Sequence, residues 1–209
     1  MFSVQRMLGR PGLFFGLLEQ SAALGVEAIC SLRPLTANLG GEPNLEPLQA
    51  IRRKDKAVVM ELEELLTRVF VTPIEREDLE SVVTQLYRIP KVAETFGEVY
   101  SIVWHLVPDL DLAIPLQMLE NASKRVAEMV RALAASSDPT EVRTLDVRLS
   151  QMEADSSAII NNALRRLYEP GGDPLQEIAV HDVYRALTEC FDACRSCGRV
   201  IALVSLKNS

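Results

Sequence analysis

The sequence predicts an all-α protein, folded as an elongated antiparallel bundle of long helices, and three observations carry this prediction. The 209 residues include only 10 glycines and 5% aromatic residues, whereas β-sandwiches and barrels need frequent turn glycines and strand-forming aromatics. Apolar residues recur at steps of three and four, the spacing of one helical face. Capping signals that contain a proline separate these stretches. The 48% hydrophobic content also predicts a buried core rather than disorder.

The first half of the chain is expected to form three helices, over 11–37, 45–70 and 73–105. In the first, Glu19 and Glu27 interrupt the apolar stretch, which favours a helix of the mature chain over a signal peptide. A capping box begins the third, with Thr72 as its N-cap, and Pro90 predicts a kink within it. The second carries an apolar row that Asp55 interrupts. That row consists of Leu48, Ile51, Val58, Leu62, Leu65 and Val69.

The second half is expected to form three more helices, over 109–135, 139–168 and 174–206. Asp138 and Asp173, each followed by a proline, are the expected N-caps of the last two. The helix over 139–168 has a weak apolar row of Val142, Leu145, Leu149, Met152, Ser156, Ile159 and Ala163. The last helix has the clearest row, typical of antiparallel bundle packing: Val180, Val183, Leu187, Cys190, Cys194, Cys197 and Ile201.

A faint internal repeat relates the two halves. In each half a long amphipathic helix ends at an aromatic residue, Phe70 or Tyr168, and a proline-marked turn and a further long helix follow. Helices of this length joined by short connections favour antiparallel neighbours.

Charge and composition exclude several classes of function. With 22 Lys and Arg against 29 Asp and Glu, the net charge of −7 argues against a nucleic-acid partner. The uncharged run 99–108 has ten residues, whereas a membrane-spanning helix needs about 20, so we expect peripheral membrane association at most. Three of the four cysteines lie on one helix face. This placement favours a packing role for the cysteines over disulfides or a metal site. It also favours a location in the reducing cytoplasm.

Catalytic motifs are absent from the sequence. It contains no nucleophile elbow, phosphate-binding glycine loop or H-E-x-x-H pair. A carboxylate-bridged dimetal enzyme needs E-x-x-H pairs on core helices, and none occurs. We therefore expect a protein that is not an enzyme.

The segment Phe70-Val71-Thr72-Pro73-Ile74-Glu75-Arg76-Glu77-Asp78-Leu79 resembles a signature of the PhoU-like phosphate-transport accessory family. Residues 14–19 near the start and 204–208 near the end are also similar to that family. The resemblance implies one domain over 1–209 made of two pseudo-repeated three-helix bundles, roughly 11–105 and 109–206. It further implies a non-enzymatic cytoplasmic regulator or accessory protein of inorganic phosphate transport, acting through contact with a Pit-type permease. The oligomeric state, including a homo-oligomer, stays open.

The family's acidic motifs, which hold metal ions in related PhoU proteins, are degenerate in this chain. In the second half Asp155 and Asp192 match them, but Gln151, Thr188 and Arg195 replace their acidic partners. The resemblance thus implies at most a weak site for a divalent or iron ion at Asp155 and Asp192, with Glu153 nearby. A metal-binding storage or sensor protein is the alternative function, and solvated surface carboxylates are the alternative interpretation of the pair.

In the first half, cations replace the family's acids. If the helices pair as in the family, Arg53 and Lys56 face Arg88 and Lys91, with Arg52 beside them. This patch could bind phosphate, an acidic lipid headgroup or an acidic loop of a partner. Alternatively, its members pair with Glu61, Glu80 or Glu94 and only keep the surface soluble.

Overall fold

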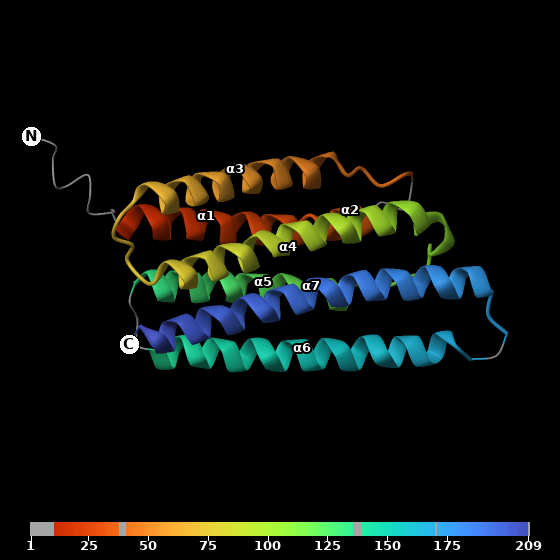
Figure 1. Ribbon diagram of the computed structural model, residues 1–209. Coiled ribbons are helices and arrows are strands. Elements are labelled where there is room, and N and C mark those ends of the chain that lie inside the picture. Colours follow the sequence, from red (N-terminus) through yellow and green to blue (C-terminus); the bar gives the residue numbers. More distant parts are fainter. Residues whose placement is uncertain (1–10, 38–40, 136–138, 170, 209) are drawn as a thin grey trace, which may run out of the picture.

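The computed structural model describes residues 11–37, 41–135, 139–169 and 171–208, and the fold is an elongated bundle of antiparallel helices (Figure 1). No strand is present in these ranges. The elements in order are α1 (Pro11–Cys30), α2 (Leu32–Ala37), α3 (Glu46–Arg68), α4 (Arg76–Val103), the 3₁₀ helix η2 (Trp104–Leu106), α5 (Ala113–Ala134), α6 (Pro139–Leu167) and α7 (Pro174–Lys207). The predicted all-α class is confirmed.

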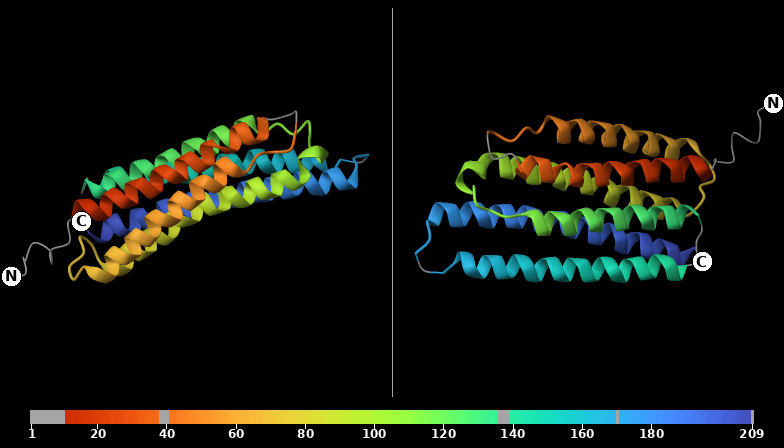
Figure 2. Two further views of the ribbon diagram at one scale, coloured as in Figure 1. Left: turned by 90° about the horizontal axis from the view of Figure 1, so that it is seen from above. Right: turned by 180° about the vertical axis from the view of Figure 1, so that it is seen from behind.

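Apart from the short α2 and η2, the helices of the described residues form two groups of three. Within the first half α1, α3 and α4 pack against one another, and within the second half α5, α6 and α7 do the same. Contacts of α1 with α5 and of α4 with α7 join the groups, so α3 and α6 lie at the two outer edges (Figures 1 and 2). This arrangement confirms the pair of three-helix bundles. The exact repeat limits, 11–105 and 109–206, stay a prediction.

Several helix limits differ from the predicted ones. The first helix is divided at Ser31, because Pro34 has no N–H to donate to the carbonyl four residues earlier. α4 begins at Arg76 rather than residue 73. Thr72 is therefore not its N-cap, and its hydroxyl instead donates to the carbonyl of Ile74 at 2.7 Å. The helix expected from residue 109 begins at Ala113, whose N–H donates to the side chain of Asp111 at 2.9 Å.

The other two predicted caps lie on the second half. Asp173 is confirmed as the N-cap of α7, because its side chain accepts the N–H of Leu175 at 3.1 Å. Asp138 lies outside the described residues.

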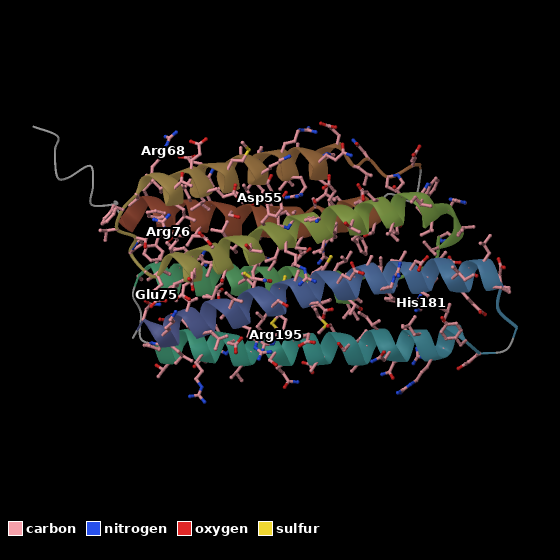
Figure 3. The ribbon with its side chains drawn as sticks, in the orientation of Figure 1. Asp55, Arg68, Glu75, Arg76, His181 and Arg195 are labelled. Carbon is pink, nitrogen blue, oxygen red and sulfur yellow. The ribbon has the colours of Figure 1, made fainter. Side chains whose placement is uncertain are left out.

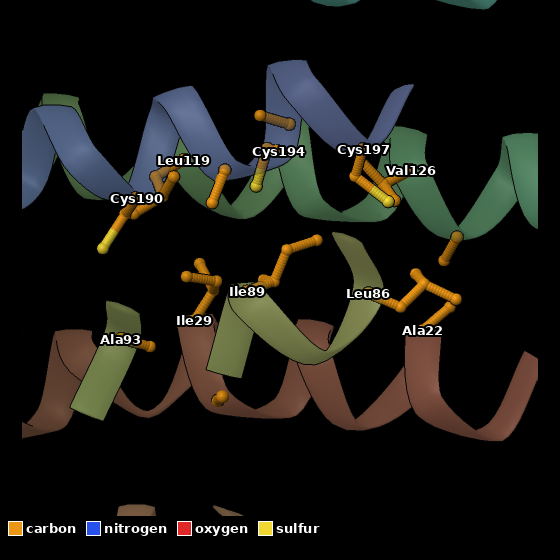
Figure 4. Close-up of a cluster of buried hydrophobic side chains, with 14 of the residues drawn as sticks. Ala22, Ile29, Leu86, Ile89, Ala93, Leu119, Val126, Cys190, Cys194 and Cys197 are labelled. Atoms are coloured by element: carbon orange, nitrogen blue, oxygen red, sulfur yellow. The ribbon is translucent and has the colours of Figure 1, made fainter. Parts of the chain in front are cut away.

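The predicted apolar row of α7 forms the centre of the molecule. All seven residues are buried, and the three cysteines are fully enclosed between α1, α4 and α5 (Figure 4). Burial raises the pKa of the Cys194 thiol to about 12 and also raises the pKa values of the Cys190 and Cys197 thiols. All three thiols therefore stay protonated and serve as packing groups. On α6 the predicted core position Ile159 is 36% exposed, and Ile160 is the buried residue instead.

One close helix contact depends on a glycine. Gly198 of α7 faces α6 and α5, and a Cβ at this position would lie 2.4 Å from a methyl carbon of Leu149. Any larger residue here would require the Leu149 side chain to move away from α7.

The expectation of peripheral membrane association at most rested on the lack of a long apolar segment, and one such segment is present. Gly12–Ala37, near the N-terminus, is long and apolar enough to span a membrane, with a mean hydropathy of 1.4. In the structure α1 packs against α3, α4 and α5, and the core helix of a soluble protein passes the same test of length and composition.

Candidate functional site

The signature segment 70–79 connects α3 to α4 and ties the ends of three helices together. The Arg76 guanidinium donates to the carbonyls of Leu66 and Val69, which lie at the end of α3 and lack partners within the helix. Glu75 and Asp78 both pair with Lys207 in the last turn of α7. Figure 3 shows Glu75 and Arg76 at this end of the bundle. Glu75, Arg76 and Asp78 of the signature thus have structural roles, while the Phe70 side chain is 86% exposed.

The predicted cationic patch lies across the outer surfaces of α3 and α4, and all four of its members are exposed. Arg53 pairs with Glu46 at 2.5 Å. For Lys56, Arg88 and Lys91 no ion pair forms with any described residue. Of the acids offered as alternative partners, Glu94 pairs with Arg52, whereas Glu61 and Glu80 pair with none of the patch cations in the described part of the chain.

A depression of about 310 Å³ lies between α3 and α4, and we call it the α3–α4 depression. It is lined by Gln49, Arg52, Arg53, Lys56, Tyr87 and Glu94. Arg88 and Lys91 do not line it. The structure therefore brings two of the four predicted residues together and adds Arg52, which the sequence placed only beside them.

A buried polar network lies directly behind the depression. Asp55 of α3 is fully enclosed (Figure 3). Its carboxylate accepts the Ser21 hydroxyl of α1 at 2.8 Å and Nη1 of Arg52 at 3.1 Å. Nε of Arg52 donates to Glu94 of α4 at 3.3 Å, and its guanidinium lies 4.3 Å from the centre of the Tyr87 ring. One arginine thus connects the depression to the packing of α1, α3 and α4.

Burial raises the pKa of the Asp55 carboxyl to about 6, although Ser21 and Arg52 both favour its charged form. Sequence reasoning identified Asp55 only as an interruption of an apolar row. The available signal was an acid at a core position with an arginine three residues earlier, a spacing that places both on one helix face. Ser21, the partner from α1, is not visible from α3 alone.

The predicted metal residues are both exposed, Asp155 on α6 and Asp192 on α7. Asp155 accepts the side-chain N–H of Gln151 at 2.8 Å. Arg195 pairs with Asp146 at 2.5 Å and approaches Glu153 at 3.9 Å, so a guanidinium already neutralises the nearby acids. Among the described residues no group of three or more His, Cys, Asp or Glu side chains could hold an ion. These residues do not fit a metal cluster, and weak binding at Asp155 and Asp192 stays a prediction.

Comparison with known proteins places the fold. No family model matches the chain. It is 22% identical over 144 residues to the UPF0111 protein YkaA of Bacillus subtilis, which covers 69% of this chain and 70% of that protein.

Two crystal structures from Shewanella oneidensis are similar to the chain. One, described as a PhoU-like phosphate regulatory protein, superposes with a TM-score of 0.73 at 16% identity, over 94% of this chain and all of the other. The second, a PhoU-like protein, gives the same TM-score and identity over 93% of this chain and 99% of the other. Over nearly its whole length, the chain has the fold of the PhoU-like proteins that its motifs resemble.

Proposed function

We propose that this chain is a cytoplasmic, non-enzymatic regulator or accessory protein of inorganic phosphate transport, and that it acts by contact with a Pit-type permease. The observation that carries the proposal is the fold shared over 94% of the chain with a protein described as a PhoU-like phosphate regulatory protein. The signature over 70–79 supports the same family from the sequence alone.

The architecture suits regulation by contact. The long helices lie side by side and offer extended surfaces of charged side chains. Large apolar side chains such as Phe70, Ile102 and Ile114 are exposed as well. A protein that binds two states of a permease with different affinities shifts the population between them by that difference. No chemical step is required of the regulator itself.

Co-purification from membranes tests the proposal. The tagged full-length chain is expressed in its own organism at high and at low phosphate, and the membrane proteins recovered with it are identified. We expect enrichment of a Pit-type permease, with different recovery at the two phosphate levels. An unrelated tagged helical bundle controls for adhesion to the resin, and absence of enrichment at both phosphate levels would contradict the proposal.

Transport supplies the second measurement. Deleting the gene should change the rate of phosphate uptake by whole cells while leaving sulfate uptake unchanged. Unaltered phosphate uptake at both phosphate levels would count against a regulatory role even if the permease co-purifies.

A further inference from the structure

Cations outnumber acids along the α3–α4 depression, which is lined by Arg52, Arg53 and Lys56 against Glu94. Residues 52–56 and 88–91 carry six cations on a chain whose net charge is −7, namely Arg52, Arg53, Lys54, Lys56, Arg88 and Lys91. Like charges three or four residues apart on a helix repel, as Arg52 and Lys56 do on α3 and Arg88 and Lys91 on α4. Because this repulsion lowers helix stability, a counter-charge from outside the chain would be favourable here.

Arg52 is the least exposed cation that lines the depression, and its neighbours hold it in a fixed position. Its side chain is 11% exposed, two of its nitrogens bond to Asp55 and Glu94, and its guanidinium lies over the Tyr87 ring. The third nitrogen, Nη2, has no acceptor among the described residues. A guanidinium already ordered by its neighbours loses little side-chain entropy when it binds a further acceptor.

Two more cations, Arg53 and Lys56, line the depression and are exposed to solvent. Lys56 has no ion-pair partner in the part of the chain that the structure describes. Arg53 pairs only with Glu46, and both side chains are more than 60% exposed, so this pair is weak and easily exchanged. The Gln49 side chain adds an amide donor to the same wall.

We propose that the α3–α4 depression binds a small phosphate-bearing anion, which accepts from Nη2 of the ordered Arg52 and pairs with the exposed side chains of Arg53 and Lys56. A phosphate group offers three or four strong acceptor oxygens and up to two negative charges. It can therefore engage a guanidinium fork and an ammonium together, which a single carboxylate does less well. The Asp55 and Glu94 contacts persist, because they use the other nitrogens of Arg52.

This inference deepens the proposed function by naming what a phosphate regulator would sense. Through Arg52, the bound anion is connected to Ser21 of α1 by the carboxylate of Asp55. The proposed permease contact does not depend on this site. Loss of anion binding with permease co-purification retained would refute the inference alone.

Titration calorimetry of the full-length protein with inorganic phosphate, at constant ionic strength, tests the site. Two double variants separate the depression from the surrounding patch. R53Q/K56Q removes two charges that line it, and R88Q/K91Q removes two charges from the same face that do not. All four side chains are exposed, so both variants should fold, which circular dichroism checks. We expect R53Q/K56Q to weaken phosphate binding about tenfold or more, and R88Q/K91Q less than about threefold.

A vesicle experiment distinguishes the two sources of a phosphate group. Flotation with phosphatidylglycerol vesicles, against phosphatidylcholine as control, detects a lipid headgroup. Flotation that is lost in R53Q/K56Q and kept in R88Q/K91Q, without binding of free phosphate, would assign the site to the headgroup. Absence of binding in both assays would overturn the proposal. Equal weakening by the two double variants would also overturn it, because diffuse surface charge would then account for the attraction.

Discussion

At the scale of single residues, Asp55 interrupts the apolar row of α3 in the sequence, yet in the structure it is buried and hydrogen-bonded. The sequence predicted the apolar row on both sides of it, and Leu48, Ile51, Val58 and Leu62 are all buried. It could not predict that Ser21 and Arg52 would meet the Asp55 carboxylate, because one of these partners comes from another helix. A buried carboxylate must be hydrogen-bonded to be tolerated, so its partners are as much a part of the core as the leucines.

The raised pKa of Asp55, about 6, predicts a specific pH dependence of stability. Folding favours the protonated form of this carboxyl, so its contribution to stability is complete below pH 4 and is lost as the pH rises through 6. Relative to Asp55→Asn, the wild-type protein should therefore gain about 2 kcal/mol in the free energy of unfolding between pH 7.5 and pH 4.5. Urea unfolding at four pH values measures this difference.

Asp155→Asn is the matched control for that series. Asp155 is also hydrogen-bonded by a side chain, but it is exposed to water on α6. Its variant should follow the wild-type curve across the same pH range. Two outcomes would show that Asp55 does not titrate as described. One is a constant difference in the free energy of unfolding between wild type and Asp55→Asn. The other is a wild-type protein that becomes more stable relative to Asp55→Asn as the pH rises.

At the scale of elements, the signature segment illustrates where helix-end prediction fails. The box over 72–75 has the residue types of a helix start, yet α4 begins at Arg76 because this arginine is engaged with the preceding helix. Capping patterns report local preference, whereas the position of Arg76 follows from the free carbonyls of α3. Asp173, without such a competing contact, behaves as its sequence predicts.

Arg76→Ala should destabilise the connection between α3 and α4. It removes the donors to the carbonyls of Leu66 and Val69, and charge-assisted bonds of this kind contribute about 1–3 kcal/mol. Arg68→Ala is the control, since its pair with Glu64 is exposed and contributes about 0.5 kcal/mol or less. Thermal unfolding by circular dichroism compares the two. Similar losses in both variants would mean that Arg76 acts only as a surface charge.

At the scale of the whole molecule, periodicity and loop length were sufficient for the class, the helix order and the antiparallel arrangement. They were not sufficient for the cationic surface. The family resemblance implied that Arg53 and Lys56 face Arg88 and Lys91, but only the first two line the depression, together with Tyr87. A surface shape arises from two helices together, and neither sequence pattern contains it.

The contacts of α1 with α5 and of α4 with α7 predict that the two halves unfold together. Separating the halves would expose the cysteine row of α7 and the faces that cover it, a large loss of buried apolar area. Urea unfolding followed by the fluorescence of Trp104, the only tryptophan, should coincide with that followed by circular dichroism. Separate midpoints would show that each three-helix group is stable alone.

The beginning of α1 and the end of α7 lie at the same end of the bundle, as Figure 2 shows. The molecule therefore has one pole at which α1 begins and α7 ends, and an opposite pole at which α2, η2 and α6 end. A fluorescent label attached to the first turn of α1 or to the last turn of α7 would mark the same pole. With a second label near Gly171, at the opposite pole, the two positions would give the direction of the long axis of the bundle relative to a membrane or a bound partner.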